Sequence, residues 1–122
     1  IKSRAATPRN RSFLSADRGI AGMDEDAPPS EVFDELFDTI EDRKRELPEG
    51  SYTASLFTHE KGENAVLEKL GEETTETILA AKDDDREEVL AESADLVYHL
   101  LVLLAMEDAT LEELRVELRN RF

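Results

Sequence analysis

The 122-residue chain contains no cysteine. It can therefore form no disulfide, no thiolate zinc site and no thiol nucleophile. It also lacks a long hydrophobic run: the longest, residues 96–106, is interrupted by His99 and falls short of the roughly 20 apolar residues that span a bilayer. These absences favour a cytoplasmic protein that does not bind membranes, with enough residues for one domain and one core.

Positive charge is scarce. Lysine and arginine total 15 against 30 aspartates and glutamates, which gives a net charge of −15. Residues 1–22 carry five of the basic residues and one acidic residue, so residues 23–122 hold 10 basic and 29 acidic residues. Such a domain repels the phosphates of nucleic acids, and we expect no nucleic-acid partner. It also repels nucleotide phosphates unless a cation intervenes. The acidic composition is typical of proteins from a high-salt cytoplasm.

Residues 1–22 show neither helical nor strand periodicity, are rich in Arg, Ser, Ala and Gly, and do not begin with methionine. We expect a disordered N-terminal extension. Its composition resembles that of a transit peptide. The interpretation that we favour takes Met23 as the natural start and residues 23–122 as the domain.

The rest of the chain has helical periodicity and no convincing strand alternation, which predicts an all-α fold. Apolar residues from Val32 to Ile40 predict a first helix with Ser30 as its N-cap, which ends before Pro48 and Gly50. A short helix is expected around Tyr52. Further helices are predicted over residues 63–82, from an Asp85–Glu88 capping box to about Met106, and from a Thr110–Glu113 capping box onward, with Leu111, Leu114 and Leu118 facing inward.

The predicted helix 63–82 carries an apolar stripe that we expect to be buried: Val66, Leu67, Leu70, Thr74, Ile78 and Ala81. At about 100° per residue, Glu73 borders this stripe, Glu76 shares its flank and Glu72 faces furthest out. Glu73 and Glu76 are three residues apart and can reach one ion.

The next helix offers a matching pair, Glu92 and Asp95, in a segment where few positions avoid burial. A buried carboxylate without a partner costs several kcal/mol, and a divalent cation is one partner that offsets this cost. The alternative is a solvated face with capped carboxylates, because about a quarter of the residues are acidic: 30 of 122. The spacing alone leaves both interpretations open.

Four carboxylates without cysteine suit a hard cation such as Mg²⁺ or Mn²⁺. The Glu-x-x-His motif of di-iron bundles does not occur in the sequence, which disfavours a di-iron site. His99 by itself is more often a core histidine than a ligand. Tyr98 is expected in the core with its hydroxyl hydrogen-bonded.

Several motifs resemble one enzyme family. EETTE followed by ESAD is similar to the Glu-Glu-x-x-Glu … Glu-x-x-Asp signature of the all-α nucleoside triphosphate pyrophosphohydrolases. PEGSYT, KLGEE, ADLVYH and the final LEELRVELRNR resemble the phosphoribosyl-ATP pyrophosphatase family over residues 31–121. This resemblance implies Mg²⁺-dependent hydrolysis of phosphoribosyl-ATP to phosphoribosyl-AMP and pyrophosphate, the second step of histidine biosynthesis.

The resemblance also implies site residues. Glu73, Glu76, Glu92 and Asp95 would be metal ligands, with Glu72 and Glu73 as the catalytic pair and Glu72 either a ligand or the residue that orients the water. The candidates for substrate binding are Lys69, Lys61, Arg43, Ser51, Tyr52 and His99. Two of these have plainer alternatives: Lys69 could pair with Glu73 four residues on, and Ser51 could cap a helix. Gly71 could leave room for a ligand or a facing helix.

The expected architecture is a bundle of four to five helices. Residues 86–106 are apolar nearly all round, which argues for burial on more sides than one small chain provides. We therefore expect a homodimer whose helices complete the core across the interface, with a small nucleotide as substrate. The alternatives are a relative that cleaves dCTP, dUTP or non-standard nucleotides, and a non-enzymatic acidic helical interaction protein.

Overall fold

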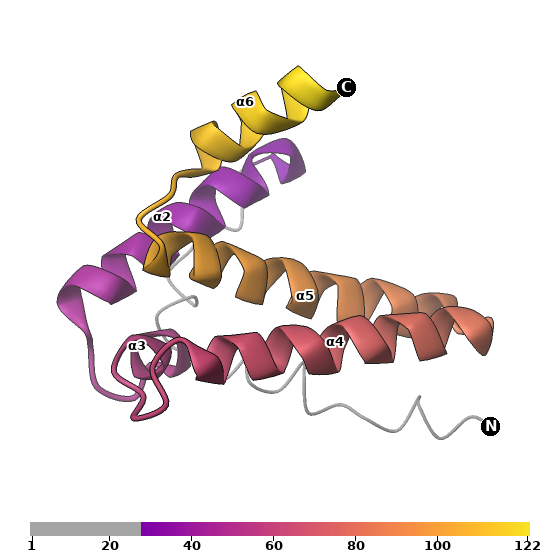
Figure 1. Cartoon of the computed structure of the whole chain (residues 1–122), viewed down its shortest axis with the longest axis horizontal. Coiled ribbons are helices and arrows are strands. Elements are labelled where there is room, and N and C mark those ends of the chain that lie inside the picture. Colours follow the sequence, from indigo (N-terminus) through magenta and orange to yellow (C-terminus); the bar gives the residue numbers. More distant parts are fainter. Residues whose placement is uncertain (1–27) are drawn as a thin grey trace.

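The computed structural model describes residues 28–122, and every regular element in this range is helical, which confirms the all-α prediction. The predicted disordered extension, residues 1–22, lies outside the described residues. Completion of the core across a dimer stays a prediction. The elements in Figure 1 are η3 (Pro29–Glu31), α2 (Val32–Glu46), α3 (Tyr52–Phe57), α4 (Asn64–Lys82), α5 (Arg86–Met106) and α6 (Leu111–Arg121).

The start of α2 differs from the prediction. Ser30 lies inside the short 3₁₀ helix, and Glu31 occupies the N-cap position without a capping side-chain bond. Pro29 fixes φ at a value that suits the first turn of a helix, so the helical conformation begins before the expected cap. At the other end, Leu47 is left-handed, with φ 49°, and its N–H donates to the carbonyl of Arg43 at 2.9 Å.

The other predicted caps are confirmed. Ser51 Oγ accepts a hydrogen bond from the N–H of Ala54 at 3.0 Å and begins α3. The Asp85 carboxylate accepts from the N–H of Glu88 at 3.2 Å and begins α5. Thr110 and Glu113 form a complete capping box at the start of α6. Each cap satisfies a backbone N–H that has no partner within its helix.

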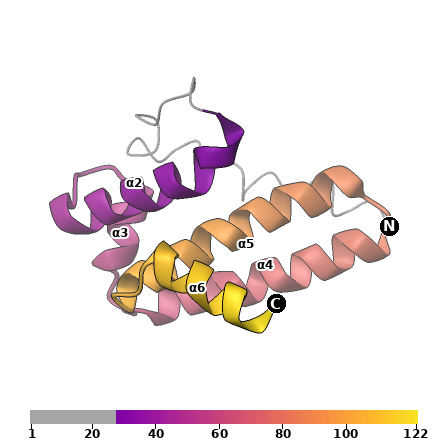
Figure 2. The same cartoon turned by 90° about the horizontal axis from the view of Figure 1, so that it is seen from above.

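α4 and α5 are antiparallel and lie side by side in both views (Figures 1 and 2). A tight turn at residues 83–85 joins them, with Asp84 in the left-handed region at φ 57°. By length and composition alone, α5 could cross a membrane. In this fold, Tyr98, Leu101, Val102 and Ala105 of α5 are buried. The core contains Phe37, Ile40, Leu56, Val66, Tyr98, Leu101, Val102 and Ala105.

The predicted buried stripe of α4 is largely wrong. Val66 is buried, but Ile78 is 57% exposed, and Thr74 and Ala81 are exposed too. Instead, α4 turns Glu73 and Ala80 toward the interior. α4 has an apolar face and a face that carries carboxylates. In residues 28–122, the face that carries the carboxylates is the one that packs on α5. Apolar periodicity therefore selected the wrong face.

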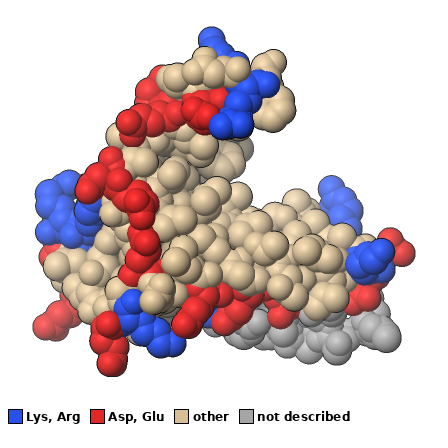
Figure 3. All heavy atoms as spheres, viewed as in Figure 1, with Lys and Arg blue, Asp and Glu red and all other residues tan. Residues whose placement is uncertain are grey.

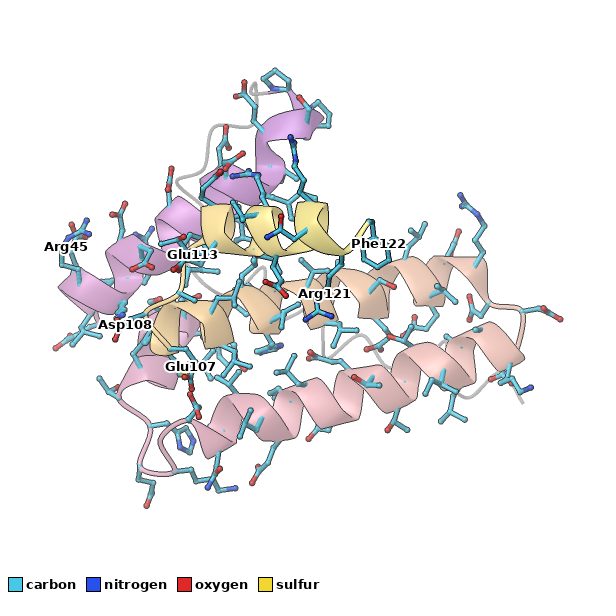
Figure 4. All side chains as sticks on the ribbon, turned by 45° about the horizontal axis from the view of Figure 1, so that its top comes forward. Arg45, Glu107, Asp108, Glu113, Arg121 and Phe122 are labelled. Atoms are coloured by element: carbon cyan, nitrogen blue, oxygen red, sulfur yellow. The ribbon has the colours of Figure 1, made fainter. Side chains whose placement is uncertain are left out.

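α2 lies beside the C-terminal end of α5, where Glu107 and Asp108 follow the helix (Figure 4). Lys44 Nζ of α2 donates to the carbonyl of Ala105 at 2.7 Å and to the carboxylate of Asp108 at 2.8 Å. A hydrogen bond with the Glu107 carboxyl raises the pKa of Glu63, just before α4. These contacts fix the position of the α4–α5 pair relative to α2.

α6 contains no buried residue and lies against α2 (Figure 1). Arg115 reaches the carboxylate of Asp34 at 2.5 Å. The predicted inward-facing residues Leu111, Leu114 and Leu118 line a cavity of about 360 Å³ that Phe33 of α2 also lines. Leu111 also packs against the main core, as predicted, whereas Leu114 and Leu118 face α2 across this cavity.

Candidate active site

Two pairs of acidic residues face each other across the α4–α5 hairpin. Glu76 and Glu92 are equally far along the chain from Asp84, and so are Glu73 and Asp95. Residues equally far from the turn of an antiparallel helix pair lie at the same level. Glu73 and Glu92 are 0% exposed, Asp95 is 1% exposed and Glu76 is half-buried. These acids therefore lie between helices, and the interpretation as a solvated face is wrong for them.

Glu73 is the most deeply placed acid of α4. Its Oε1 lies 2.8 Å from Nδ1 of His99, and both side chains are fully buried. Its other oxygen, Oε2, is buried and has no hydrogen-bond partner. The sequence placed Glu73 only at the border of the core. Glu73 is buried more deeply than predicted because the face of α4 that packs on α5 is not the face that periodicity indicated.

The buried oxygen of Glu73 and the carboxylates around it suit a hard divalent cation in kind. In residues 28–122, no three His, Asp or Glu side chains already converge on one point in a geometry that would hold a metal. The role of these carboxylates as metal ligands stays a prediction that the donor chemistry supports.

Glu72 is exposed, as predicted for the outermost acid of the LGEETTE segment. Lys69 Nζ lies 3.6 Å from its Oε1, one helical turn away. The structure therefore pairs Lys69 with Glu72, three residues on, and the expected alternative pairing with Glu73 is wrong. Glu73 is inaccessible to Lys69 because its side chain points into the interior.

A cavity of about 180 Å³ opens beside the start of α4. It brings together three predicted substrate-binding residues from separate segments: Tyr52 of α3, Lys61 of the following loop and Lys69 of α4. Lys61 Nζ also lies 3.1 Å from Glu68 Oε1 on the cavity wall. The two lysines of this cavity are paired with glutamates, Lys61 with Glu68 and Lys69 with Glu72, and their role in binding an anionic substrate stays a prediction.

The other three candidates lie elsewhere. Ser51 is buried and caps α3, and His99 is buried against Glu73. Arg43 lies in the last turn of α2, outside the lining of the cavity, and its Nε is buried without a hydrogen-bond partner.

Sequence reasoning missed the three other polar residues of the cavity lining: Ser55, His59 and Glu68. His59 accepts a hydrogen bond through Nδ1 from the N–H of Lys61 at 3.0 Å. The only signal for His59 was its position two residues before Lys61 in a short loop. That signal is too weak to separate it from an ordinary surface histidine.

The chain is similar to known proteins over nearly all of the described range. The family model described as phosphoribosyl-ATP pyrophosphohydrolase matches residues 33–122. A phosphoribosyl-ATP pyrophosphatase of Haloarcula marismortui is 74% identical over 91 residues, which are 75% of this chain and 93% of that protein. The protein of the same name from Natronomonas pharaonis is 76% identical over 91 residues, 75% of this chain and 90% of that protein.

A more distant relative matches the same part of the chain. The phosphoribosyl-ATP pyrophosphatase of Methanococcoides burtonii is 54% identical over 90 residues, which are 74% of this chain and 91% of that protein. The family match runs from the second residue of α2 through α6 and includes both acid pairs and the cavity. The chain belongs to the phosphoribosyl-ATP pyrophosphohydrolase family.

Proposed function

We propose that this protein hydrolyses phosphoribosyl-ATP to phosphoribosyl-AMP and pyrophosphate, in the second step of histidine biosynthesis. The observation that carries the proposal is the burial of Glu73, Glu92 and Asp95 between α4 and α5, in a chain 74% identical to a protein named for this reaction. Burial of carboxylates costs folding free energy, and a bound cation that in turn binds an anionic substrate would offset this cost.

Glu73, Glu76, Glu92 and Asp95 would hold Mg²⁺, with Mn²⁺ as the alternative. When bound, the ion would polarise the α–β phosphoanhydride and lower the pKa of the attacking water. The helices hold the acids in place, so the catalytic contribution of the chain is positioning and charge balance. Glu72, exposed at the edge of the cluster, is available with Glu73 to orient the water.

Lys61, Lys69 and Tyr52 would bind substrate at the cavity beside α4. Its volume, about 180 Å³, is below the roughly 300–1,000 Å³ of common ligand sites. The cavity therefore accommodates one part of the substrate, such as a phosphate or a ribose, and the remainder contacts another surface.

A homodimer would supply that surface. Large apolar residues are exposed on α4 and α5, where a soluble monomer usually buries them. They are Leu67, Ile78 and Leu79 on α4, with Leu90 and Leu100 on α5. Figure 3 shows a broad band of uncharged residues over these two helices, while acidic residues gather toward the edges. A second copy packed on this band would complete the core, and the assembly would be cytoplasmic without a nucleic-acid partner.

The test is pyrophosphate release from phosphoribosyl-ATP, with dCTP and dUTP in parallel, in high salt with Mg²⁺ or with EDTA. We expect release from phosphoribosyl-ATP alone, only with Mg²⁺, and its loss in Glu73→Gln. Glu87→Gln is the matched control, because Glu87 is exposed in the first turn of α5. Release from the pyrimidine nucleotides instead would overturn the substrate, and an active Glu73→Gln variant would overturn the role of the site.

A further inference from the structure

Three side chains from three helices form a continuous hydrogen-bonded series. Tyr52 Oη of α3 lies 3.1 Å from His99 Nε2 of α5. His99 Nδ1 lies 2.8 Å from Glu73 Oε1 of α4. Tyr52 lines the cavity that holds Lys61 and Lys69. The series therefore runs from the wall of the cavity to a buried carboxylate of the proposed metal site.

The surroundings of His99 fix the direction of these hydrogen bonds. Nδ1 faces two acceptors, the carboxylate of Glu73 and the backbone carbonyl of Asp95, the latter at 3.1 Å. An acceptor pair at one ring nitrogen places the ring proton on that nitrogen. His99 therefore donates to Glu73 through Nδ1, and its Nε2 faces the hydroxyl of Tyr52.

The hydrogen bond from His99 has a consequence for Glu73. It holds Oε1 in one orientation and leaves Oε2 as the oxygen without a partner. A carboxylate fixed on one side presents its other oxygen in a set direction, and residues that fix a metal ligand in this way strengthen metal binding.

We propose that His99 and Tyr52 are positioning residues that hold the Glu73 carboxylate so that Oε2 is available to the metal ion. This proposal rests on the proposed function. His99 is neither an ordinary core histidine nor a contact to substrate.

A neighbouring hydrogen bond provides the control. Thr53 Oγ1 and Tyr98 Oη, one residue further along α3 and one residue earlier on α5, are also hydrogen-bonded and buried. Tyr98→Phe removes a hydroxyl from the same pair of helices, and its ring stays in edge contact with His99, with centroids 4.8 Å apart. It removes one hydrogen bond between α3 and α5 but none of the hydrogen bonds of the series from Tyr52 to Glu73.

The experiment measures Mn²⁺ binding to the substrate-free protein by electron paramagnetic resonance, and kcat and KM separately, on four variants. In His99→Asn the side-chain amide N–H replaces Nδ1–H, whereas in His99→Gln it lies at the position of Nε2 and the donor to Glu73 is lost. We expect His99→Gln to weaken Mn²⁺ binding by about 10–100-fold, and His99→Asn to restore most of it. Tyr52→Phe should lower both Mn²⁺ affinity and kcat, whereas Tyr98→Phe should change neither.

Equal Mn²⁺ affinity in His99→Gln and the wild type would overturn the proposal, as would indistinguishable Tyr52→Phe and Tyr98→Phe variants. Circular dichroism and thermal melts establish that each variant is folded. If His99→Gln does not fold, the comparison of Tyr52→Phe with Tyr98→Phe still tests the proposal, because both substitutions keep the aromatic ring and remove only a hydroxyl. The Mn²⁺ affinities can be measured whether or not the protein is active. If the wild type released no pyrophosphate, the proposed reaction would be wrong, but the Mn²⁺ affinities would still test the positioning role.

Discussion

At the scale of single residues, Gly71 occupies a helical position where glycine costs about 1 kcal/mol relative to alanine. A Cβ built at this position meets no atom within 4 Å. Within residues 28–122, no facing helix requires a glycine there, so that part of the expectation is wrong, and room for a ligand stays a prediction.

Gly71→Ala should raise the free energy of unfolding by about 0.5–1 kcal/mol, because alanine restricts the unfolded chain and fits the helix. Urea denaturation followed by circular dichroism measures the change. A fall in stability would contradict this and would place another molecule against Gly71. Kinetic assays on the same variant separate a ligand, which would raise KM, from a purely structural effect.

The placement of Glu73, Glu76, Glu92 and Asp95 as two pairs on neighbouring helices could be predicted from the sequence, but the full burial of Glu73 could not. The spacing of Glu73, Glu76, Glu92 and Asp95 is local information within two helices. The depth of Glu73 depends on His99, which is 26 residues away along the chain. No periodicity within one helix reports a partner on another, so the bond that orients Glu73 appears only in three dimensions.

At the scale of helices, the run Asp83, Asp84 and Asp85 contains one capping residue. Only Asp85 accepts a hydrogen bond from the N–H of Glu88, at 3.2 Å. We expect Asp85→Ala to lower the free energy of unfolding by about 1 kcal/mol, as other cap removals do. Asp83→Ala is the control and should change it by less than about 0.5 kcal/mol. Equal effects in thermal melts would mean that net charge, not capping, determines stability at this turn.

The end of α5 gives a pH dependence. The hydrogen bond from Lys44, with its positive charge, lowers the pKa of Asp108 below its ordinary value. A carboxyl with a lower pKa in the folded state contributes stability above its unfolded pKa of about 4, and loses it as the pH falls through the folded pKa. Asp108→Asn should therefore flatten the dependence of stability on pH below about pH 4.

The matched control for this prediction is Asp84→Asn. Asp84 is also an exposed aspartate with a left-handed backbone, φ 57° against 58° for Asp108, and asparagine tolerates that conformation. Urea melts at pH 3 to 6 should show a shallower slope for Asp108→Asn than for Asp84→Asn. Identical slopes would mean that the Lys44–Asp108 pair does not contribute in solution.

Helix ends were more predictable than helix faces. Ser51, Asp85 and Thr110 cap the helices that the sequence assigned to them, because a cap bonds to a backbone group three residues away. The face of α4 that packs on α5 depends on the whole hairpin, and the apolar residue Ile78 on its other face is 57% exposed. Periodicity identified the apolar face of α4 that carries Ile78, but it did not indicate which surface packs on it.

At the scale of the whole molecule, a net charge of −15 on 122 residues opposes compaction. Acidic residues gather over α2 and α6 and along the lower edge of α4 in Figure 3. Salt screens such repulsion, with a Debye length that falls from about 10 Å at 0.1 M to about 3 Å at 1 M. We expect Tm to rise by several degrees over this range of KCl.

Sucrose at matched osmolality is the control for this prediction, because it stabilises by exclusion and leaves charge repulsion unscreened. Differential scanning calorimetry in both series separates the two effects. A Tm that is insensitive to KCl, or that falls as KCl rises, would show that the ion pairs such as Lys44–Asp108 and Arg115–Asp34 outweigh the repulsion among the acids.

The turn at residues 83–85 also constrains how this protein can evolve. Its three N–H groups all bond to carbonyls of the last turns of α4: Asp83 to Leu79, Asp84 to Ala81 and Asp85 to Ala80. An inserted or deleted residue in the turn would therefore break these hydrogen bonds and shift one acid pair along the hairpin relative to the other. Descendants of this gene can gain or lose residues in the loops before α4 and after α5, whereas the stretch between Glu73 and Asp95 should keep its length as its sequence drifts.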